Sequence, residues 1–593
     1  MSALSNFFNA RSQREVGPSY KWIALSNTTL GVLLGAMDSS IILISMPDIF
    51  KGLHVNPLAP AETQNLLWML MGYQIVTATL LVSLGRLADV RGRVRIYNMG
   101  FAIFSVGSVL LYFVPELTPQ LGDTAVLELI LFRLVQGVGA ACLIANSTAI
   151  LTDAFPPEQR GLALGINMVA GLGGSLVGLL LGGVLAAISW RWVFLVSVPL
   201  GILGTIWGYI SLRDQSTKRV SARLDIPGNA CLGMGLVLIA VSATYGLLPF
   251  GHSTVGWSNP LVIGGLIAGV LLLVAFAFVE ARVRDPLFNL SLFKIRPFTM
   301  GSIAQFLVSI AYGGLQLMFI IWLQGIWLPL HGYSFEQTPL WSAIYLIPLL
   351  AGYTLFGVTS GWLASKVSAR LVTTIAMIGL AITFLVLRTF PANFDYTAFA
   401  IVLFLVGACF GVFSAPNTTS VMNSLPPEYR GVGSGMRATF QFAGNPLSLS
   451  VYFSVMILAL SISLPVTVRL GLATTGLPAQ VISGIANLPP TGAMFAVFLG
   501  YNPMQTLVPA QVLQTLSPAV QANIIGTTFF PNMISGAFIG ALHDVFLFSA
   551  GLAALAALFS ALRGRKFIYE QATAGDIQNL HLEAIASASE AGK

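Results

Sequence analysis

The sequence contains very little charge. Asp, Glu, Lys and Arg make up only 9% of its 593 residues, whereas 56% of the residues are hydrophobic. An average soluble domain carries roughly 25% charged residues. So few charged side chains cannot coat a water-soluble fold of this length, and we expect the chain to lie in lipid.

Cysteine and histidine are also scarce, which excludes several classes of protein. The three cysteines, Cys142, Cys231 and Cys409, fall within apolar runs and indicate buried hydrophobic side chains rather than a disulfide framework. The five histidines are scattered, and no nucleophile–base pair or metal-ligand spacing accompanies them. We therefore expect no enzyme, no metal site and no cofactor. A phosphate-binding P-loop is absent too, which excludes ATP-driven pumping within this chain.

Long apolar runs are what the chain does contain. Fourteen of them reach the length of about 20 residues that a helix needs to cross a bilayer. Because this number is even, both ends of the chain are expected on one side of the membrane. The predicted spans are 22–47, 63–84, 96–114, 125–152, 161–187, 191–212, 226–248, 260–280, 298–328, 337–363, 371–389, 396–424, 431–462 and 536–562.

The basic residues orient these spans. Most of the 29 Lys and Arg residues fall in short loops on the side of the termini, while Lys51, Arg191, Arg388 and Arg469 fall opposite and Arg133 lies within a span. Since an excess of Lys and Arg marks cytoplasmic loops, we expect a multi-pass protein of the cell membrane with both termini cytoplasmic. Short positive loops do not form a basic face, so we expect no nucleic-acid partner.

A repeat divides the chain into two related halves. Residues 155–165 read FPPEQRGLALG, and residues 425–435 read LPPEYRGVGSG. Parallel repeats about an axis along the membrane normal, with a site between them near the midplane, are an architecture of transporters. The predicted organisation is a cytoplasmic segment (1–21), a six-helix bundle (22–212), two inserted helices (226–280), a second six-helix bundle (298–562) and a cytoplasmic tail (563–593).

A long segment, 463–535, separates the last two spans. It is nearly uncharged and rich in Pro, Gly and Gln. We predict an extracytoplasmic hairpin or short helices over the outer mouth, with an apolar surface suited to lipid or a partner. A loosely ordered loop is the alternative.

Several motifs resemble those of one transporter family. MDSSIILISMP (37–47) resembles a first-helix signature with Asp38 in the acid position, and GRLADVRGRVR (85–95) resembles the loop after the second helix. LILFRLVQGVGAA (129–141) resembles the fourth-helix pattern. On these motifs the chain is similar to the major facilitator superfamily, in particular its fourteen-helix drug:proton antiporters. The resemblance implies an all-α polytopic membrane fold of two six-helix bundles with two inserted helices.

Two positions depart from that family's pattern. In GSLVGLLLGG (174–183), Leu179 stands where the fifth-helix antiporter motif has Pro, and Leu43 replaces a first-helix Asn. Leu179 argues against proton antiport but not against transport. In the family, the glycines of this segment pack the fifth helix where the halves meet, because small residues permit close helix approach. These glycines are Gly174, Gly178, Gly182 and Gly183.

Asp38 is expected to carry the protons. A carboxylate at mid-membrane depth is costly when ionised, so it either faces a polar cavity or holds its proton. The other charge expected deep within a span is Arg133, and the resemblance implies that the first and fourth helices line one cavity. We predict that Asp38 exchanges protons and that Arg133 tunes the proton affinity of Asp38. The alternative for Asp38 is a structural acid whose hydrogen bonds are satisfied by neighbouring serines. The alternative for Arg133 is a donor of hydrogen bonds between helices.

Two further acids, Glu128 and Asp544, are expected near the outer ends of their spans. Glu128 lies five residues before Arg133, about 140° around a helix, so the two do not share a face. We expect Glu128 to be a solvated vestibule acid, with a second proton or cation site as the alternative. Asp544 follows His543, and we expect an interfacial polar pair, with titration near neutral pH as the alternative.

The loop of residues 85–95 is expected to act as a conformational latch. Asp89 can complement the positive N-terminus of a neighbouring helix, and Arg93 can pair with Asp153 at the cytoplasmic end of the fourth span. Such contacts would hold the outward-facing state and break on inward opening, and topology signalling alone is the alternative. The predicted latch residues are Gly85, Asp89, Arg91, Gly92, Arg93 and Asp153.

The polar residues of the expected cavity indicate the cargo. The C-terminal half is expected to hold almost no charge within the membrane, and amides and aromatic rings suit lipophilic compounds that are neutral or singly cationic. We expect a monomeric exporter of such compounds, driven by proton influx and surrounded by membrane lipids. A lipid or amphiphile transporter without proton coupling is the alternative. The candidate cavity residues are Gln136, Gln305, Tyr312, Gln316, Tyr345, Asn417, Gln441 and Asn445.

Overall fold

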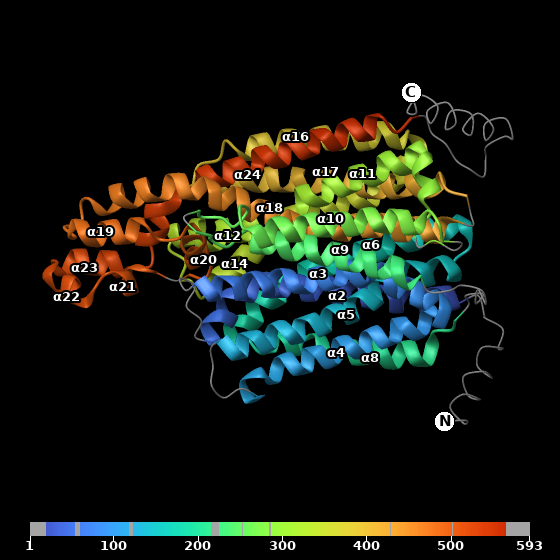
Figure 1. Ribbon diagram of the computed structural model, residues 1–593, viewed down its shortest axis with the longest axis horizontal. Helices are drawn as coiled ribbons and strands as arrows, with labels where there is room; N and C mark the ends of the chain where they lie inside the picture. The colour runs from blue at the N-terminus through green and yellow to red at the C-terminus, as the bar shows by residue number, and fades with distance from the viewer. Residues whose placement is uncertain are drawn as a thin grey trace.

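Helices form nearly the whole of the described chain (Figure 1). Within that part of the chain there is no β-strand, only an isolated bridge between Phe250 and Ser253. Most of the two predicted terminal segments lies outside the described residues. The computed structural model describes residues 19–53, 60–117, 123–214, 225–251, 253–283, 286, 288–426, 429–500 and 502–564.

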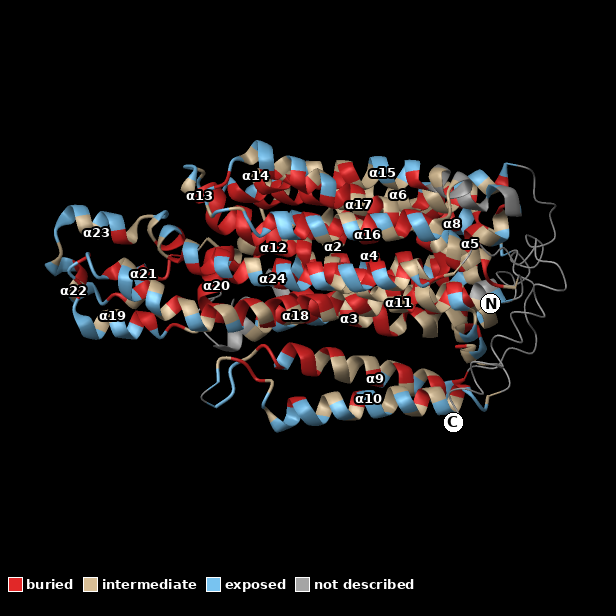
Figure 2. Cartoon of the chain, turned by 90° about the horizontal axis from the view of Figure 1, so that it is seen from above, coloured by how far each residue is buried: buried red, intermediate tan, exposed pale blue. Residues whose placement is uncertain are grey.

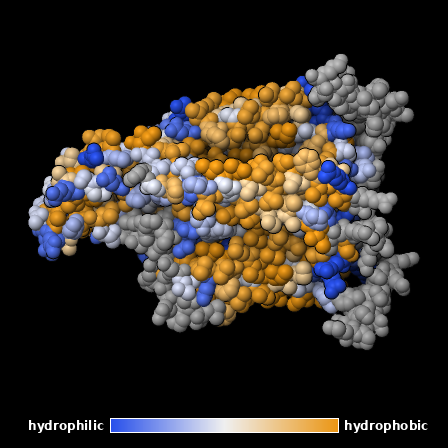
Figure 3. All heavy atoms as spheres, in the orientation of Figure 1, coloured by the Kyte–Doolittle hydropathy of each residue, from blue (hydrophilic) through white to orange (hydrophobic). Residues whose placement is uncertain are grey.

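The chain is a multi-pass membrane protein. Fourteen helices in the described residues are long and apolar enough to cross a membrane, and each overlaps a span predicted from the sequence. On the face that Figure 3 shows, hydrophobic side chains cover most of the middle of the bundle, and hydrophilic ones gather toward its two ends. The prediction of an all-α polytopic fold with fourteen spans is confirmed.

The first half of the bundle contains five long and two shorter helices. Gly92 makes the turn between the second and third of them with a φ of 106°, where a side chain would be strained and would meet Asp214. We call the end at which α2 begins and α24 ends the inner end. The helices are α2 (Tyr20–Gly52), α3 (Pro60–Arg91), α4 (Arg93–Leu117), α5 (Asp123–Ala154), α6 (Pro157–Ile188), α7 (Trp192–Leu195) and α8 (Ser197–Ser211).

Two inserted helices follow and lie along one flank of the bundle (Figure 2). They are α9 (Ile226–Tyr245) and α10 (Pro260–Glu280). Each begins at a polar cap, because the side chains of Asp225 and Asn259 accept hydrogen bonds from backbone N–H groups of the first turn.

The second half contains interrupted helices. The ninth span bends at a Gly pair and then at a π-helical turn, and the tenth breaks before Pro348. The boundary between the first and the second half is taken from the sequence repeat and remains a proposal. The elements are η1 (Leu290–Lys294), α11 (Arg296–Gly313), α12 (Leu315–Trp322), η2 (Leu323–Trp327), α13 (Leu328–Leu330), α14 (Thr338–Tyr345), α15 (Ile347–Lys366), α16 (Ala369–Leu387), α17 (Tyr396–Asn423), α18 (Arg430–Leu472) and α24 (Phe529–Ala561).

A helical cap projects from the outer end of the bundle (Figure 1). It stands between α18 and α24, which both run further outward than the predicted spans. The first ten residues of the segment 463–535 continue α18, and most of the rest forms the short helices that the sequence suggested. The cap helices are α19 (Ala479–Ala486), α20 (Pro490–Phe498), α21 (Met504–Leu507), α22 (Ala510–Thr515) and α23 (Pro518–Ile525).

One cap helix, α20, enters the bundle. All nine of its residues are buried, and it is bent by 84° against α19. The ring centroid of Phe495 lies 5.6 Å from that of Phe453 on α18, and a side chain at Gly325 of η2 would meet Val497. Because α20 also contacts α3 of the first half, it plugs the outer end between the two halves.

Further contacts between the halves lie at the same end. Lys51 Nζ lies 3.6 Å from Glu336 Oε1, and Gly183 of α6 abuts the backbone of Leu340 on α14. The largest buried core joins the outer portions of both halves, whereas the smaller cores nearer the inner end lie mostly within one half. The molecule is therefore closed at its outer end.

Candidate functional site

Asp38 and Arg133 form an ion pair inside the first half. Arg133 Nη1 of α5 donates to Asp38 Oδ2 of α2 at 2.5 Å. Gln136 Nε2 donates to Asp38 Oδ1 and to Ser108 Oγ of α4, at 2.8 Å each, and Gln136 Oε1 accepts from Arg133 at 2.5 Å. The spacing of three residues puts Arg133 and Gln136 on one face of α5. Side chains of α2 and α5 thus meet at one carboxylate, and Gln136 links the cluster to α4.

The cluster is sealed from solvent. Asp38 and Gln136 are 0% exposed and Arg133 is 2% exposed. Tyr73 of α3 covers the guanidinium, with 4.4 Å between its ring centroid and Arg133 Cζ. Since desolvation offsets the attraction of a buried ion pair, such a pair is weak evidence for a purely stabilising role. An ionisable pair at this depth is instead a candidate proton site.

The Asp38 carboxyl group can be ionised or protonated, and each form would leave the cluster with different contacts. With the carboxylate ionised, Arg133 is charge-compensated and links α2 to α5. With the carboxyl protonated, the guanidinium keeps Gln136 and the face of Tyr73 as its partners. The proton would thereby weaken a contact between helices.

The predicted accessory acids lie elsewhere. Glu128 is partly buried nearer the outer end of α5, and its buried Oε2 has no partner within the described part of the chain. Asp544 is exposed, and its neighbour His543 places Nε2 3.0 Å from the carbonyl oxygen of Phe390, in the loop after α16. The roles of both acids stay predictions.

Three of the six predicted latch residues meet within the first half. Arg93 at the start of α4 donates from Nε to Asp89 Oδ1 at 2.9 Å and from Nη1 to Asp153 Oδ2 at 2.6 Å. Arg91 is exposed, and a Cβ at Gly85 would lie 3.8 Å from Ala145. These ion pairs tie α3, α4 and α5 together at the inner end. Their release during transport stays a prediction.

Three of the four predicted glycines pack α6 against α2. A Cβ at Gly174, Gly178 or Gly182 would collide with atoms of α2, and in the case of Gly178 with the backbone of Met37. Gly183 faces α14 of the second half instead. Because Met37 precedes the acid of the cluster, this seam fixes where α2 holds its carboxylate.

Gly178→Leu is expected to destabilise the protein, since overpacking costs about 1–3 kcal/mol. The matched control is Gly173→Leu on the same helix, where a Cβ would meet nothing within 4 Å. The fraction of protein that stays monodisperse after heating in detergent measures the effect. Equal heat resistance of the two variants would contradict the seam.

The eight candidate cavity residues fall into separate groups. Gln136 belongs to the Asp38 cluster. Asn417 Nδ2 donates to Gln305 Oε1 at 3.2 Å, and both side chains are buried. Tyr345 lies among aromatic rings at the outer end, 4.4 Å from Tyr396 between centroids. The remaining four residues are partly exposed: Tyr312, Gln316, Gln441 and Asn445.

Two arginines, Arg437 and Arg563, lie toward the inner end of the second half, and the expectation that this half holds almost no charge within the membrane stays a prediction. Arg437 lies on α18, about two turns from its start and inside a candidate span. Arg563, just beyond α24, turns back to donate to Asn417 Oδ1 and is 2% exposed. Burial lowers the pKa of Arg563 to about 10, which leaves it charged at neutral pH. Arg437 escaped notice because its nearness to a span end assigned it to the cytoplasmic loops.

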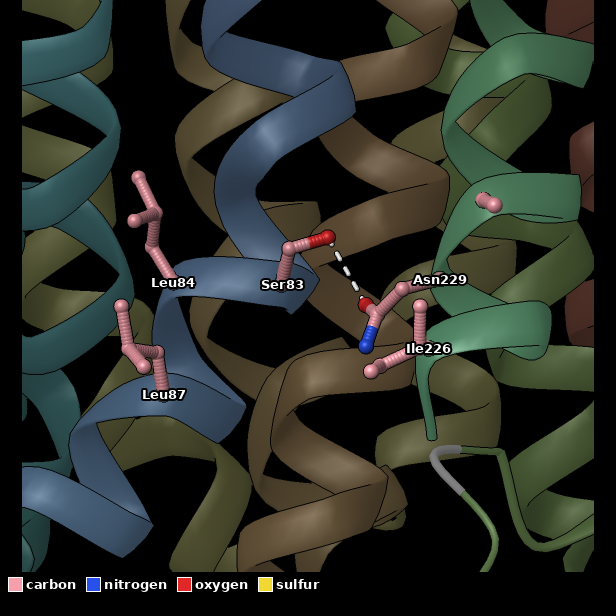
Figure 4. A pocket seen from close by; sticks show the side chains of 6 residues that line it. Ser83, Leu84, Leu87, Ile226 and Asn229 are labelled. Atoms are coloured by element: carbon pink, nitrogen blue, oxygen red, sulfur yellow. Dashed lines mark hydrogen bonds between the residues drawn. The ribbon is translucent and has the colours of Figure 1, made fainter. Parts of the chain in front are cut away.

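A groove between α3 and α9 lies apart from these residues (Figure 4). Leu84, Leu87 and Ile226 give it an apolar lining. Ser83 Oγ donates to Asn229 Oδ1 at 2.8 Å across it and so joins the inserted helix to the first half. The groove holds no titratable side chain and has the character of a lipid-facing joint.

Known proteins share both the sequence pattern and the fold. The family model described as the Major Facilitator Superfamily matches residues 28–227 and again 226–449. Multidrug resistance protein 3 of Bacillus subtilis (strain 168) is 27% identical over 442 residues, which cover 74% of this chain and 80% of that protein. The tetracenomycin C resistance and export protein of Streptomyces glaucescens is 25% identical, over 72% of this chain and 75% of its own length.

A solved structure shows the same fold at low identity. A bacterial homologue of the human lysosomal transporter Spinster, in an inward-facing and occupied conformation, has a TM-score of 0.53 and 17% sequence identity. The match covers 94% of this chain and 100% of that one. Since the family model spans most of the chain, the protein belongs to the Major Facilitator Superfamily, and it is a transporter related to multidrug efflux proteins rather than an enzyme.

Proposed function

We propose that the protein exports lipophilic compounds by alternating access and that proton influx through Asp38 drives the export. The observation that carries the proposal is the sealed ion pair between Asp38 and Arg133, on two different helices. An acid in this setting can be compensated in one state and protonated in the other. The setting that we propose is the cell membrane, with both termini cytoplasmic and a monomeric protein among membrane lipids.

The position of Asp38 suggests how the proton acts on the outer closure. The same helix, α2, carries Asp38 at its middle and Lys51, paired with Glu336, at its outer end. Ile44, between them, accepts a hydrogen bond from Gln324 Nε2 at 3.4 Å. Loss of the ion pair on protonation would free α2 from α5, and a movement of α2 would strain both outer contacts. Proton binding would in this way favour opening.

The cargo proposed from the sequence is lipophilic and neutral or cationic. Arg133 already neutralises Asp38 in this structure, so a cation would have to displace a guanidinium to reach the acid. We propose that apolar contact and aromatic rings supply most of the affinity.

Transport in proteoliposomes with an imposed pH gradient tests this proposal. The probes are two xanthene dyes that differ in charge, rhodamine 123 and fluorescein. We expect transport of at least one dye to run against the proton flow, to reverse with the sign of the gradient and to stop when a protonophore is added. Dye movement that ignores the gradient would contradict proton coupling.

A lipid or amphiphile transporter is the second candidate. Two observations favour it: Leu179 in place of the motif proline, and the uncharged helix α20 at the outer end. Transport of a fluorescent phospholipid between protein-containing vesicles, unaffected by the pH gradient, would select this candidate over the first.

A further inference from the structure

We propose that Arg437 is the centre of a subsite for an anionic group of the cargo and that the preferred cargo is a lipophilic acid with a planar aromatic body. The inference rests on the proposed function, because it takes the face between the two halves as the path of the cargo. It keeps the lipophilic cargo of that function and replaces the neutral or cationic charge expected from the sequence with a negative one.

Arg437 has no carboxylate as a counter-ion within the described part of the chain. Its Nη1 donates to Gln441 Oε1 at 3.2 Å, and its Nε is without a partner in the same part of the chain. Among the described residues, the cations in ion pairs with carboxylates are Lys51, Arg93 and Arg133, and Arg437 is not one of them. A guanidinium within a membrane span is costly when uncompensated. A bound anion would compensate it.

Arg437 lies on a helix that contacts the other half of the molecule. Its helix, α18, packs against α3 of the first half, and α15 packs against α6 at the opposite edge. Arg437 lies close enough to Tyr353 of α15 for the two groups to act on each other electrostatically. A side chain that extends from α18 toward α15 crosses the face that the second half turns to the first.

Arg563 also has nitrogens without a partner among the described residues, Nε and Nη1, but it is less exposed than Arg437. Arg563 is 2% exposed and held by Asn417, which in turn bonds Gln305. It ties the end of α24 to α17 and α11 and is sealed within the second half. Arg437, in contrast, is partly exposed, although its Nε is buried.

Aromatic rings lie beside Arg437. The ring centroids of Tyr312 and Phe410 are 3.8 Å apart, and Tyr353 stacks on Tyr312 at 6.4 Å with an interplanar angle of 21°. Both tyrosines are partly exposed. A planar aromatic ligand can stack on such a surface, which favours offset parallel contact.

Two buried polar atoms of this half are donors without a partner among the described residues. One is Nε2 of Gln316, which lies at the start of the part of the ninth span beyond the Gly pair. The other is Arg437 Nε. A carboxylate or phenolate accepts from a guanidinium in the strongest class of protein hydrogen bonds. Donors and a cation without a carboxylate partner favour an anionic cargo, which accepts hydrogen bonds, over a cationic cargo.

Dye binding to the purified full-length protein in detergent tests the subsite. Fluorescein and rhodamine 123 share the xanthene body and differ in charge, and fluorescence polarisation at one pH gives both affinities. We expect the native protein to prefer fluorescein. In Arg437→Gln the fluorescein affinity should fall about tenfold, with rhodamine 123 changed less than about twofold, because a hydrogen bond to a charged group is lost.

Two further variants keep the result interpretable. Arg437→Lys retains the charge and should recover part of the fluorescein affinity. Arg469→Gln removes an exposed cation from the outer end of the same helix and should leave both affinities unchanged. Variants are compared only as monodisperse protein. If Arg437→Gln does not fold, the preference of Arg437→Lys for fluorescein over rhodamine 123 is compared with that of the native protein instead.

Three outcomes would overturn the subsite: no binding of fluorescein by native protein, an equal loss for both dyes, or no loss at all. Because binding is measured at one pH without a membrane, these outcomes leave proton coupling untouched. Conversely, dye transport that ignores a pH gradient would remove the proton-driven cycle without changing the ratio of the two binding affinities.

Discussion

Asp38→Asn is expected to abolish gradient-driven export and to leave exchange of cargo at equal pH. The amide cannot ionise, so the variant stays in one of the two states that the native carboxyl can take. Export against a concentration gradient should fall to the level of protein-free liposomes. Exchange of labelled for unlabelled dye, with the same pH on both sides, needs no net proton movement and should persist.

Asn is a better substitution than Ala at this position. The amide oxygen can still accept from Arg133, and the side chain fills the same space between α2 and α5. Truncation to Ala would leave a buried guanidinium uncompensated, which destabilises a protein by roughly 3–5 kcal/mol. Asp544→Asn, which removes an exposed acid from α24, is the matched control. Gradient-driven export by Asp38→Asn at the native rate would refute the role of Asp38.

A covalent link across the outer closure is expected to block export almost completely. Lys51 and Glu336 belong to different halves, are 73% and 80% exposed and lie 3.6 Å apart. An exposed pair of this kind contributes only about 0–1 kcal/mol, so replacing both residues with Cys should preserve the closed form. A short, cleavable bis-thiol reagent should then hold the outer end shut, and a reductant should restore transport.

The link is tested in a protein without its own three cysteines, with Ala at Cys142, Cys231 and Cys409. Each single variant, Lys51→Cys or Glu336→Cys, is treated with the same reagent and should stay active. Dye export in proteoliposomes before and after reduction is the measurement. Full export by the linked protein would mean that the cargo leaves without separation of the halves at this point.

The fold was largely predictable because lipid imposes a simple length rule. A bilayer requires about 20 apolar residues per span, so the spans are visible in the sequence one by one. Asp38 and Arg133 were also visible, because a charge stands out in an apolar run. The resemblance implied only that the helices of Asp38 and Arg133 line one cavity. The 2.5 Å ion pair and its links to Gln136 and Ser108 are visible only in the structure.

Other features depend on contacts that composition does not encode. Arg437 lies near the end of a span, where a cation normally marks a loop, and its inward direction depends on the packing of α18. The segment 463–535 has no strong helical period, and α20 is held by burial against other helices rather than by its own pattern. The glycines of α6 were recognisable as a seam, but their division between α2 and α14 was not.

Proton release on cargo binding tests the central claim most directly. Purified protein in a weakly buffered solution is mixed with a saturating dye, and a pH indicator records the protons released. We predict that native protein releases protons, that Asp544→Asn does so equally, and that Asp38→Asn releases none. Equal release by native protein and Asp38→Asn would contradict the claim that this carboxyl exchanges its proton for cargo.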